Sequence, residues 1–193
     1  MESFYTIQGE GAFSGTPAYF IRLGGCDVGC HWCDVKESWD RSIHPEKSVE
    51  EIVEEAKLSK AQMVVITGGE PLMYDLTELT SKLRESGLRT HVETSGAHPY
   101  SGQWDWVCFS PKKFKQPHPE FYKKSHELKV IIYNRSDFDW ARQHAASMHA
   151  EAKCYIQPEW SKESEMLPAI IQFVKENPGW RISLQVHKYM SIP

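Results

Sequence analysis

The sequence of 193 residues lacks a long apolar run, internal repeats and low-complexity tracts. No stretch approaches the ~20 apolar residues that span a bilayer. The start does not resemble a secretory signal, because Glu2 follows at once and no apolar run comes after it. We therefore expect no membrane association and a cytoplasmic location. No linker is evident, so we expect a single domain over residues 1–193.

The sequence also lacks an excess of basic residues. It has 22 Lys and Arg against 26 Asp and Glu, a formal net charge of −4. A broad surface for nucleic acid or an anionic membrane needs the opposite balance. We expect no nucleic-acid partner and a small-molecule substrate instead.

Cysteine is scarce, but its placement is informative. Of five cysteines, Cys26, Cys30 and Cys33 fall within eight residues, spaced Cys-x3-Cys-x2-Cys, whereas Cys108 and Cys154 are isolated among apolar residues. In the cytosol clustered thiols are typical metal ligands rather than disulfides. The loop 24–35 therefore predicts a centre with three protein ligands and one open position, where chemistry takes place.

The spacing alone leaves other interpretations of the cysteine loop open. Thiolates suit zinc as well as iron–sulfur iron. A zinc knuckle would take His31 or Asp34 as its fourth ligand. Three buried structural thiols would need no metal.

Short apolar runs alternate with amphipathic segments, a pattern that predicts an α/β fold with a mainly parallel sheet. Ser48 and Glu51 form a capping-box pattern at the start of one helix. The expected strands are a short one beginning at Phe4, then 18–23, 63–66, 89–93, 106–109, 128–132, 154–156 and a last strand at 182–186. The expected helices are 48–57, 76–86, 138–148 and 166–175. The tail 187–193 is expected to fold over the strand ends or to fray.

Polar motifs follow the ends of the predicted strands. Thr67-Gly68-Gly69-Glu70-Pro71, Glu93-Thr94-Ser95-Gly96 and Ser110-Pro111-Lys112 each come directly after one. In parallel α/β sheets, ligands bind at the carboxyl ends of the strands. Arg22 lies inside an apolar run, and buried arginine is costly unless paired. It is therefore either an edge residue or the ligand of an anion in a cavity.

The cysteine loop, with an aromatic residue before its third cysteine, resembles the cluster loop of the radical S-adenosylmethionine (SAM) superfamily. Together with Thr6-Ile7-Gln8-Gly9-Glu10-Gly11, Ile21-Arg22-Leu23 and the Gly-Gly-Glu motif, it closely resembles one family of that superfamily, the 7-carboxy-7-deazaguanine synthases. The resemblance covers residues 3–193. It implies a reduced (β/α)6 partial barrel, a [4Fe-4S] cluster, SAM, Mg²⁺, a homodimer, and flavodoxin or ferredoxin as the electron donor.

The resemblance also implies an activity and a set of site residues. The family converts 6-carboxy-5,6,7,8-tetrahydropterin to 7-carboxy-7-deazaguanine with loss of ammonia, on the route to queuosine. By this resemblance Cys26, Cys30 and Cys33 hold the cluster. SAM contacts are expected from Trp32, Cys33, Asp34, Gly69, Glu93, Ser95, Ser110, Pro111, Lys112 and Gln157. The pterin is expected against Ile7, Gln8, Gly9, Glu10, Arg22 and Thr67, with Pro193 closing the pocket.

One position departs from the family pattern. The family usually has Ser or Thr two residues after the third cysteine, where its hydroxyl binds Mg²⁺, but this chain has Val35. Valine offers no oxygen, and Mg²⁺ prefers oxygen ligands. Either the ion binds through substrate, water and Asp34, or another cation replaces it, or none is needed. We expect a weaker dependence on Mg²⁺ than in relatives that have the hydroxyl.

Two other functions compete with this one. A small radical SAM enzyme that makes a glycyl radical on a partner protein would share the cysteine loop. The Gln-Gly-Glu-Gly segment and the proline tail argue against it. A non-enzymatic zinc-binding module would use the same thiols with no SAM.

Overall fold

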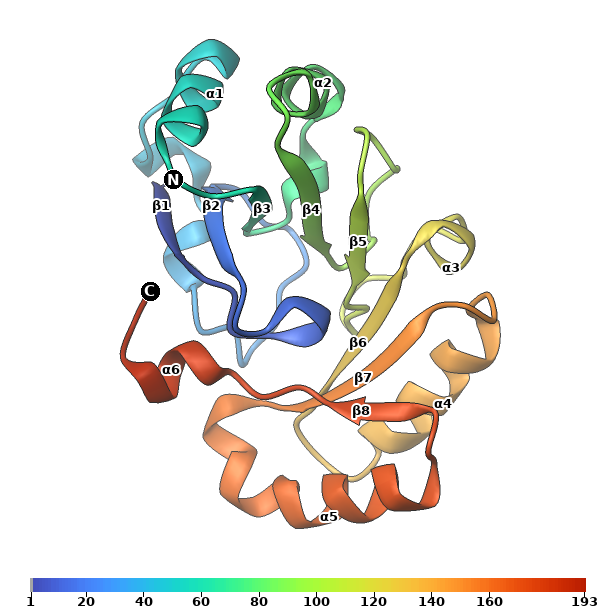
Figure 1. The fold of residues 1–193 in the computed structure, drawn as a ribbon. Coiled ribbons are helices and arrows are strands. Elements are labelled where there is room, and N and C mark those ends of the chain that lie inside the picture. Colours follow the sequence, from blue (N-terminus) through green and yellow to red (C-terminus); the bar gives the residue numbers. More distant parts are fainter. Residues whose placement is uncertain (1) are drawn as a thin grey trace.

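A computed structural model describes residues 2–193 and contains one eight-stranded sheet whose strands lie in chain order (Figure 1). β1 is antiparallel to β2, and every other neighbouring pair is parallel. The expected mainly parallel α/β fold is therefore confirmed. The strands are β1 Glu2–Ile7, β2 Pro17–Leu23, β3 Met63–Gly68, β4 Arg89–Thr94, β5 Trp106–Phe109, β6 Glu127–Ile132, β7 Lys153–Pro158 and β8 Trp180–Ile182.

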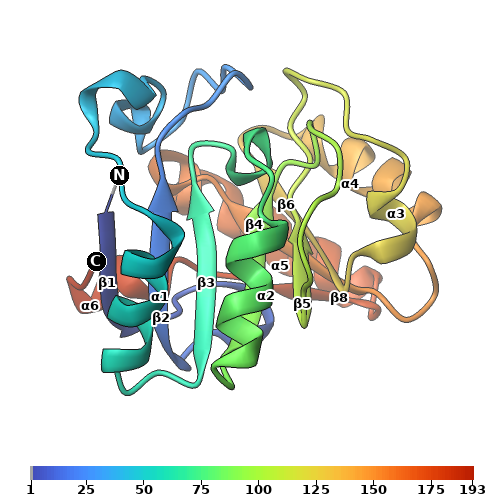
Figure 2. The same cartoon turned by 90° about the horizontal axis from the view of Figure 1, so that it is seen from above.

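The helices α1 to α5 lie outside the curved sheet, as Figures 1 and 2 show. α1 packs on α2, α2 on β4, α4 on β6, and α5 on β7 and β8. The α-helices are α1 Val49–Leu58, α2 Thr77–Glu85, α3 Phe121–Lys124, α4 Asp137–Ser147, α5 Glu163–Glu176 and α6 Val186–Met190. The 3-10 helices are η1 Gly11–Phe13, η2 Lys36–Ser38, η3 Arg41–Ile43, η4 Pro71–Met73 and η5 Trp160–Lys162.

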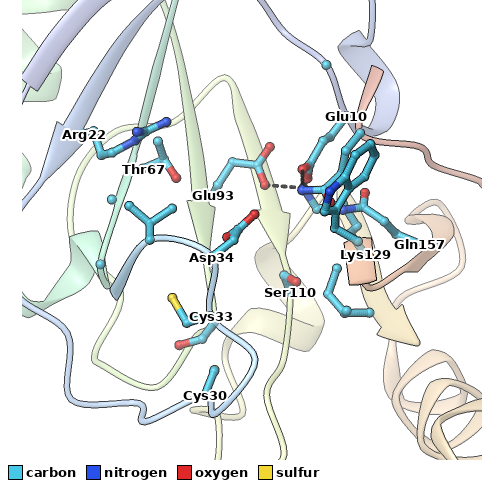
Figure 3. A pocket seen from close by; sticks show the side chains of 18 of the residues that line it. Glu10, Arg22, Cys30, Cys33, Asp34, Thr67, Glu93, Ser110, Lys129 and Gln157 are labelled. Carbon is cyan, nitrogen blue, oxygen red and sulfur yellow. Dashed lines mark hydrogen bonds and ion pairs between the residues drawn. The ribbon is translucent and has the colours of Figure 1, made fainter. Parts of the chain in front are cut away.

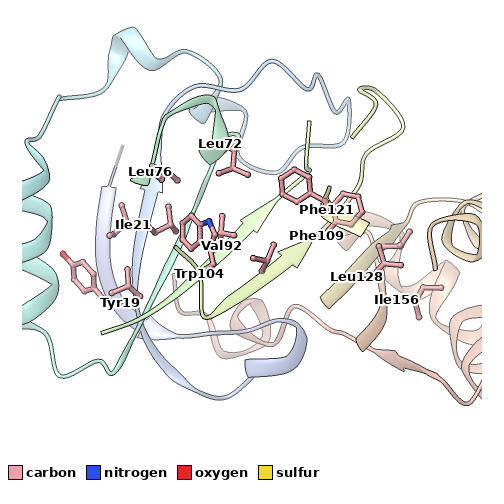
Figure 4. Close-up of a cluster of buried hydrophobic side chains, with 14 of the residues drawn as sticks. Tyr19, Ile21, Leu72, Leu76, Val92, Trp104, Phe109, Phe121, Leu128 and Ile156 are labelled. Carbon is pink, nitrogen blue, oxygen red and sulfur yellow. The ribbon is translucent and has the colours of Figure 1, made fainter. Parts of the chain in front are cut away.

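The main hydrophobic core fills the layer between the sheet and these helices (Figure 4). Val92, Phe109, Leu128 and Ile156 come from successive strands and are fully buried there. Burying apolar surface is the main favourable contribution to folding, so this outer layer holds the strands in register. It thereby fixes where the strand ends lie.

The inner face of the sheet is different in character. A small apolar cluster of Ala18, Met63 and Val65 occupies one part of it. Farther along β4 and β6, toward the carboxyl ends of the strands, the inner face carries Glu93 and Lys129. The polar part of the interior therefore lies where parallel strands bind ligands.

The sheet does not close on itself, and the C-terminal segment occupies the gap between β1 and β8 (Figure 1). The Val186 N–H donates to the Gly9 carbonyl at 3.0 Å. The Thr6 hydroxyl donates to the Pro193 carbonyl at 3.4 Å. The C-terminal segment therefore lies against the end of β1 and the residues that follow it.

The predicted last strand at 182–186 is wrong, because β8 ends at Ile182 and Val186 begins α6. Its alternating apolar residues are typical of a strand, but the chain turns toward β1 instead. The Ser183 N–H still bonds to Ile156 on β7, whereas that of Val186 bonds to Gly9. The predicted capping box is confirmed: Ser48 and Glu51 bond reciprocally at the start of α1.

Within residues 2–193, no helix combines the length and apolar character that crossing a membrane requires.

Two adjacent isoleucines on α5 test the outer core. Ile170 is fully buried, whereas Ile171 is 45% exposed. Ile170→Ala should lower the free energy of unfolding by about 2–5 kcal/mol because it leaves a cavity. The control Ile171→Ala should change it by no more than about 0.5 kcal/mol. Anaerobic urea unfolding measures both, and equal effects would contradict the assigned core.

Candidate active site

One cavity opens at the carboxyl ends of the parallel strands (Figure 3). As drawn, Arg22 and Thr67 lie on one side, Glu10, Lys129 and Gln157 on the other, and the cysteine loop below. The cavity brings together every residue predicted for the site except Pro111, which is buried but does not line it. The predicted residues that line it are Ile7, Gln8, Gly9, Glu10, Arg22, Cys26, Cys30, Trp32, Cys33, Asp34, Val35, Thr67, Gly69, Glu93, Ser95, Ser110, Lys112, Gln157 and Pro193.

Backbone hydrogen bonds fix the start of the cysteine loop. The Gly25 N–H donates to Ser38 at 2.6 Å, and that of Cys26 donates to Trp39 at 3.2 Å. The Tyr74 hydroxyl donates to the Gly24 carbonyl at 2.7 Å. The loop is thus tied both to the segment that follows it and to the end of η4.

The three thiols are soft ligands at one cavity, a donor set that suits an iron–sulfur cluster. All are free, Cys30 is buried, and all three line the cavity. In the part of the chain that the structure describes, no three His, Cys, Asp or Glu side chains converge closely enough to hold one metal ion. A single zinc ion needs each sulfur at ~2.3 Å from the metal, whereas in a four-iron cluster each sulfur binds a separate iron.

The loop also provides an apolar setting for the sulfurs. Cys30 packs with Val28 and Ala97, and Cys26 and Cys33 lie against this cluster. Burial raises the pKa of the Cys30 thiol to about 11. Coordination by a cation is therefore what would hold the thiolate form here.

The Gly-Gly-Glu motif lies directly against the cysteine loop. The Gly69 N–H donates to Leu23 at 3.0 Å, and that of Glu70 donates to Gly25 at 2.8 Å. A Cβ atom on Gly69 would collide with the Gly25 carbonyl oxygen. Gly68 has φ of 138°, which other residues rarely adopt. The turn and its contact with the cysteine loop therefore require glycine at both positions 68 and 69.

The Glu70 carboxylate is buried and engaged within the protein. It accepts hydrogen bonds from the Thr94 hydroxyl at 2.6 Å, from both the N–H and hydroxyl of Ser95 at 2.8 and 2.5 Å, and from the Leu72 N–H at 3.1 Å. Both oxygens are used. Glu70 thus ties the Gly-Gly-Glu turn to the end of β4.

Arg22 lies on β2 at the cavity edge, and Thr67 lies beside it on the neighbouring strand β3. Its guanidinium pairs with Glu2 at 2.5 Å and stacks over Phe4 at 5.3 Å from the ring centre. The arginine is therefore both a cavity residue and a paired one. Its position suits a substrate carboxylate, which a guanidinium binds bidentately.

Opposite Arg22, the Lys129 ammonium lies between two carboxylates, 2.5 Å from Glu10 and 2.5 Å from Glu93. Burial alone would raise the pKa of Glu10, but the charge and hydrogen bond of Lys129 outweigh it and lower the pKa to about 2 from 4.5. Ionised Glu10 therefore stabilises the fold above pH 4.5, and this contribution is lost as the pH falls toward 2.

Two further cations lie near the cysteine loop. Lys112 donates to the Ser110 carbonyl at 2.8 Å and lies 5.9 Å from the Trp32 ring centre. Burial lowers the pKa of Lys112, while the nearby Cys30 thiol opposes that shift. Lys188 on α6 pairs with Asp34 at 2.6 Å.

Sequence reasoning missed several residues that line the cavity. Lys129 carried a usable signal, because it is a charged residue inside an apolar predicted strand, as Arg22 is. Gln185 carried none, because the structure places it by an unexpected turn. Val28, Gly68, Glu70, Thr94 and His187 belong to segments that the sequence singled out, but they had no individual role. The lining residues missed are Phe4, Phe20, Trp39, Lys129, Ile131, Pro158, Glu159, Trp160 and Gln185.

Comparison with known proteins agrees with this geometry. The model of the radical SAM superfamily matches residues 20–115. A 7-carboxy-7-deazaguanine synthase of Flavobacterium psychrophilum is 57% identical over 100% of this chain and 91% of its own. The chain belongs to the 7-carboxy-7-deazaguanine synthase family of radical SAM enzymes.

Other relatives support the family membership. The synthase of a Synechocystis species is 49% identical, over 99% of this chain and 91% of its own. The crystal structure of QueE from Escherichia coli matches with a TM-score of 0.82 at 32% identity, over 96% of this chain and 92% of that one. Radical SAM enzymes use a [4Fe-4S] cluster and SAM, so the family implies both cofactors here.

Glu70 provides a test of the site's framework. Glu70→Gln replaces an acceptor-only carboxylate with a group that also donates, which leaves two donors facing each other in a buried place. We expect a loss of about 1.5–3 kcal/mol of stability and weaker SAM binding. The exposed Glu78→Gln is the control. Urea unfolding measures the stability, and titration with SAM measures its affinity. If neither changes in Glu70→Gln, Glu70 does not connect the Gly-Gly-Glu turn to β4 as described.

Proposed function

We propose that this chain converts 6-carboxy-5,6,7,8-tetrahydropterin to 7-carboxy-7-deazaguanine with loss of ammonia. One observation carries the proposal: a single cavity joins the three cysteines of the radical SAM loop to the Gln8–Glu10 segment and to Arg22. The names of the full-length relatives agree with it. The three thiols would hold the [4Fe-4S] cluster, which with SAM supplies a carbon radical able to remove a hydrogen atom.

On the SAM side, we assign Trp32 to the adenine and the Gly69 backbone to the methionine part. Asp34, Glu93, Ser95, the Ser110–Lys112 turn and Gln157 are further candidates. The hydroxyl of Ser95 already donates to Glu70, so its contribution to SAM would come as an acceptor. Lys112 is a partly buried cation at the cavity, which suits the carboxylate of SAM.

On the substrate side, Arg22 would bind the pterin carboxylate, and Thr67 lies beside it. Ile7, Gln8, Gly9 and Glu10 would line the ring. A Cβ atom on Gly9 would collide with His187, so α6 covers this segment closely. The tail ending at Pro193 would exclude water from the cavity. The protein's part is thus to bind and orient, since the cofactors carry the difficult chemistry.

The quaternary structure and the electron donor are also proposals. We propose a homodimer and a flavodoxin or ferredoxin as reductant, on the resemblance to the family alone. The domain is proposed to span residues 1–193.

The competing functions lose support. The relatives described above are named as synthases rather than activating enzymes, and they cover nearly the whole chain. A zinc-binding module would not require the match to the radical SAM superfamily.

Product analysis tests the activity. Anaerobic protein incubated with SAM, dithionite and the carboxypterin should form the deazapurine, detected by absorbance and mass. Cys30→Ala should lose the brown colour and the product, because the cluster then lacks a ligand. Cys154→Ala is the control and should retain both, since Cys154 does not line the cavity. SAM cleavage without deazapurine would refute the proposed substrate; a colourless wild type would refute the cluster.

The Val35 position gives a separate prediction. Val35 lines the cavity but has no oxygen, and Asp34 already pairs with Lys188. Turnover should therefore change little, about twofold or less, between added Mg²⁺ and a chelator, because Mg²⁺ requires oxygen ligands. Val35→Thr should make turnover more responsive to Mg²⁺. A sharp Mg²⁺ requirement in the wild type would count against this expectation.

A further inference from the structure

Lys129 is a buried cation that no motif predicted. Its side chain is 3% exposed, and it lies on the inner face of β6 at the cavity wall. The two carboxylates that it pairs come from different parts of the chain, Glu10 before η1 and Glu93 on β4. One ammonium therefore fixes two acids that line the substrate cavity (Figure 3).

Each carboxylate is also held by an amide. The Gln8 side chain donates to Glu93 at 3.1 Å, and the Gln185 side chain donates to Glu10 at 2.9 Å. Each carboxylate thus accepts one hydrogen bond on each oxygen. An ionised carboxylate has about four lone-pair sites, so both retain acceptor capacity.

The acidic groups around Lys129 favour its charged form. Desolvation opposes this charge, but the surrounding acidic groups raise the pKa of Lys129 well above its usual value. At this wall two carboxylates share one ammonium. The other titratable groups around it are His91 on β4, Cys108 on β5, Lys112 after β5, Glu127 on β6 and His187 on α6.

This wall matches one edge of the proposed substrate. The pyrimidine half of a pterin presents its 2-amino group and ring N–H as hydrogen-bond donors. Ionised carboxylates only accept, so they suit these donors and disfavour a carbonyl in their place. A lumazine, in which a carbonyl replaces the 2-amino group, would set acceptor against acceptor. Arg22, on the far side of the cavity, would meanwhile take the carboxylate end.

We propose that Lys129 is a positioning residue that keeps Glu10 ionised and holds both Glu10 and Glu93 turned toward the pyrimidine edge of the substrate. This inference assigns Glu93 to the substrate rather than to SAM. It thereby sets the preference for a pterin over a lumazine. The proposal rests on the proposed function, since it deepens the assignment of the same cavity. Lys129 acts through the two carboxylates and need not touch the substrate.

The test is ligand binding to the SAM-bound holoenzyme. The probes are 6-carboxypterin and 6-carboxylumazine, followed by their fluorescence. The wild type should prefer the pterin, with an affinity that is nearly flat from about pH 5.5 to 8, because Lys129 keeps Glu10 ionised. In Lys129→Met, the burial of Glu10 is no longer offset, so Glu10 takes up a proton. Pterin affinity should then fall by about tenfold per pH unit as the pH is lowered, and the preference over lumazine should shrink.

The controls separate positioning from folding. Lys123→Met removes an exposed lysine on α3 and should behave as the wild type. Formation of 5′-deoxyadenosine from SAM without substrate should be retained in Lys129→Met, because the inference places both partners of Lys129 on the substrate side. If Lys129→Met does not fold, Glu10→Gln replaces it. That variant retains the Lys129–Glu93 pair, and its pterin preference should fall.

The outcomes distinguish the two proposals. A wild type that binds neither probe would refute the proposed function. If the wild type binds the pterin and Lys129→Met shows the same preference and the same pH profile as the wild type, only the role of Lys129 would be overturned. An unchanged preference in Glu10→Gln would overturn it in the same way.

Discussion

The site depends on one close approach between two backbones. Gly69, after β3, lies so near Gly25 that a side chain on Gly69 would collide with the Gly25 carbonyl, and the Glu70 N–H bonds across the contact. This contact joins the thiol loop to the strand ends. Glu70 extends the connection to β4 through Thr94 and Ser95. The packed core of the sheet therefore determines where the cysteines lie.

Much of the fold was predictable because its signals are local. Apolar runs predicted β3 and β5, and Ser48 with Glu51 predicted the start of α1. The cysteine spacing and the Gly-Gly-Glu turn indicated which segments would meet, since parallel strands end on one edge. The turn at Ser183 was not predictable, because the residues there have a strand-like pattern. Their bonding partner Gly9 lies at the other end of the sequence.

The grouping of Lys129 with Glu10 and Glu93 was missed for a related reason. A lysine in a predicted strand is visible in the sequence, but its two partners are 119 and 36 residues away. Only the curvature of the sheet brings them together. The polar interior thus depends on the apolar exterior: α4 and α5 hold β6 and β7 in the orientation that turns Lys129 inward.

The crossing of the C-terminal segment to β1 has a consequence for how the chain is made. Gln8–Gly11 leave the ribosome long before the residues that cover and bond to them, from Ser183 to His187. Most of the helical layer can assemble in the meantime. The cavity wall between β1 and β8 cannot be completed until residues 183–187 emerge, so a nascent chain cannot retain a ligand before then.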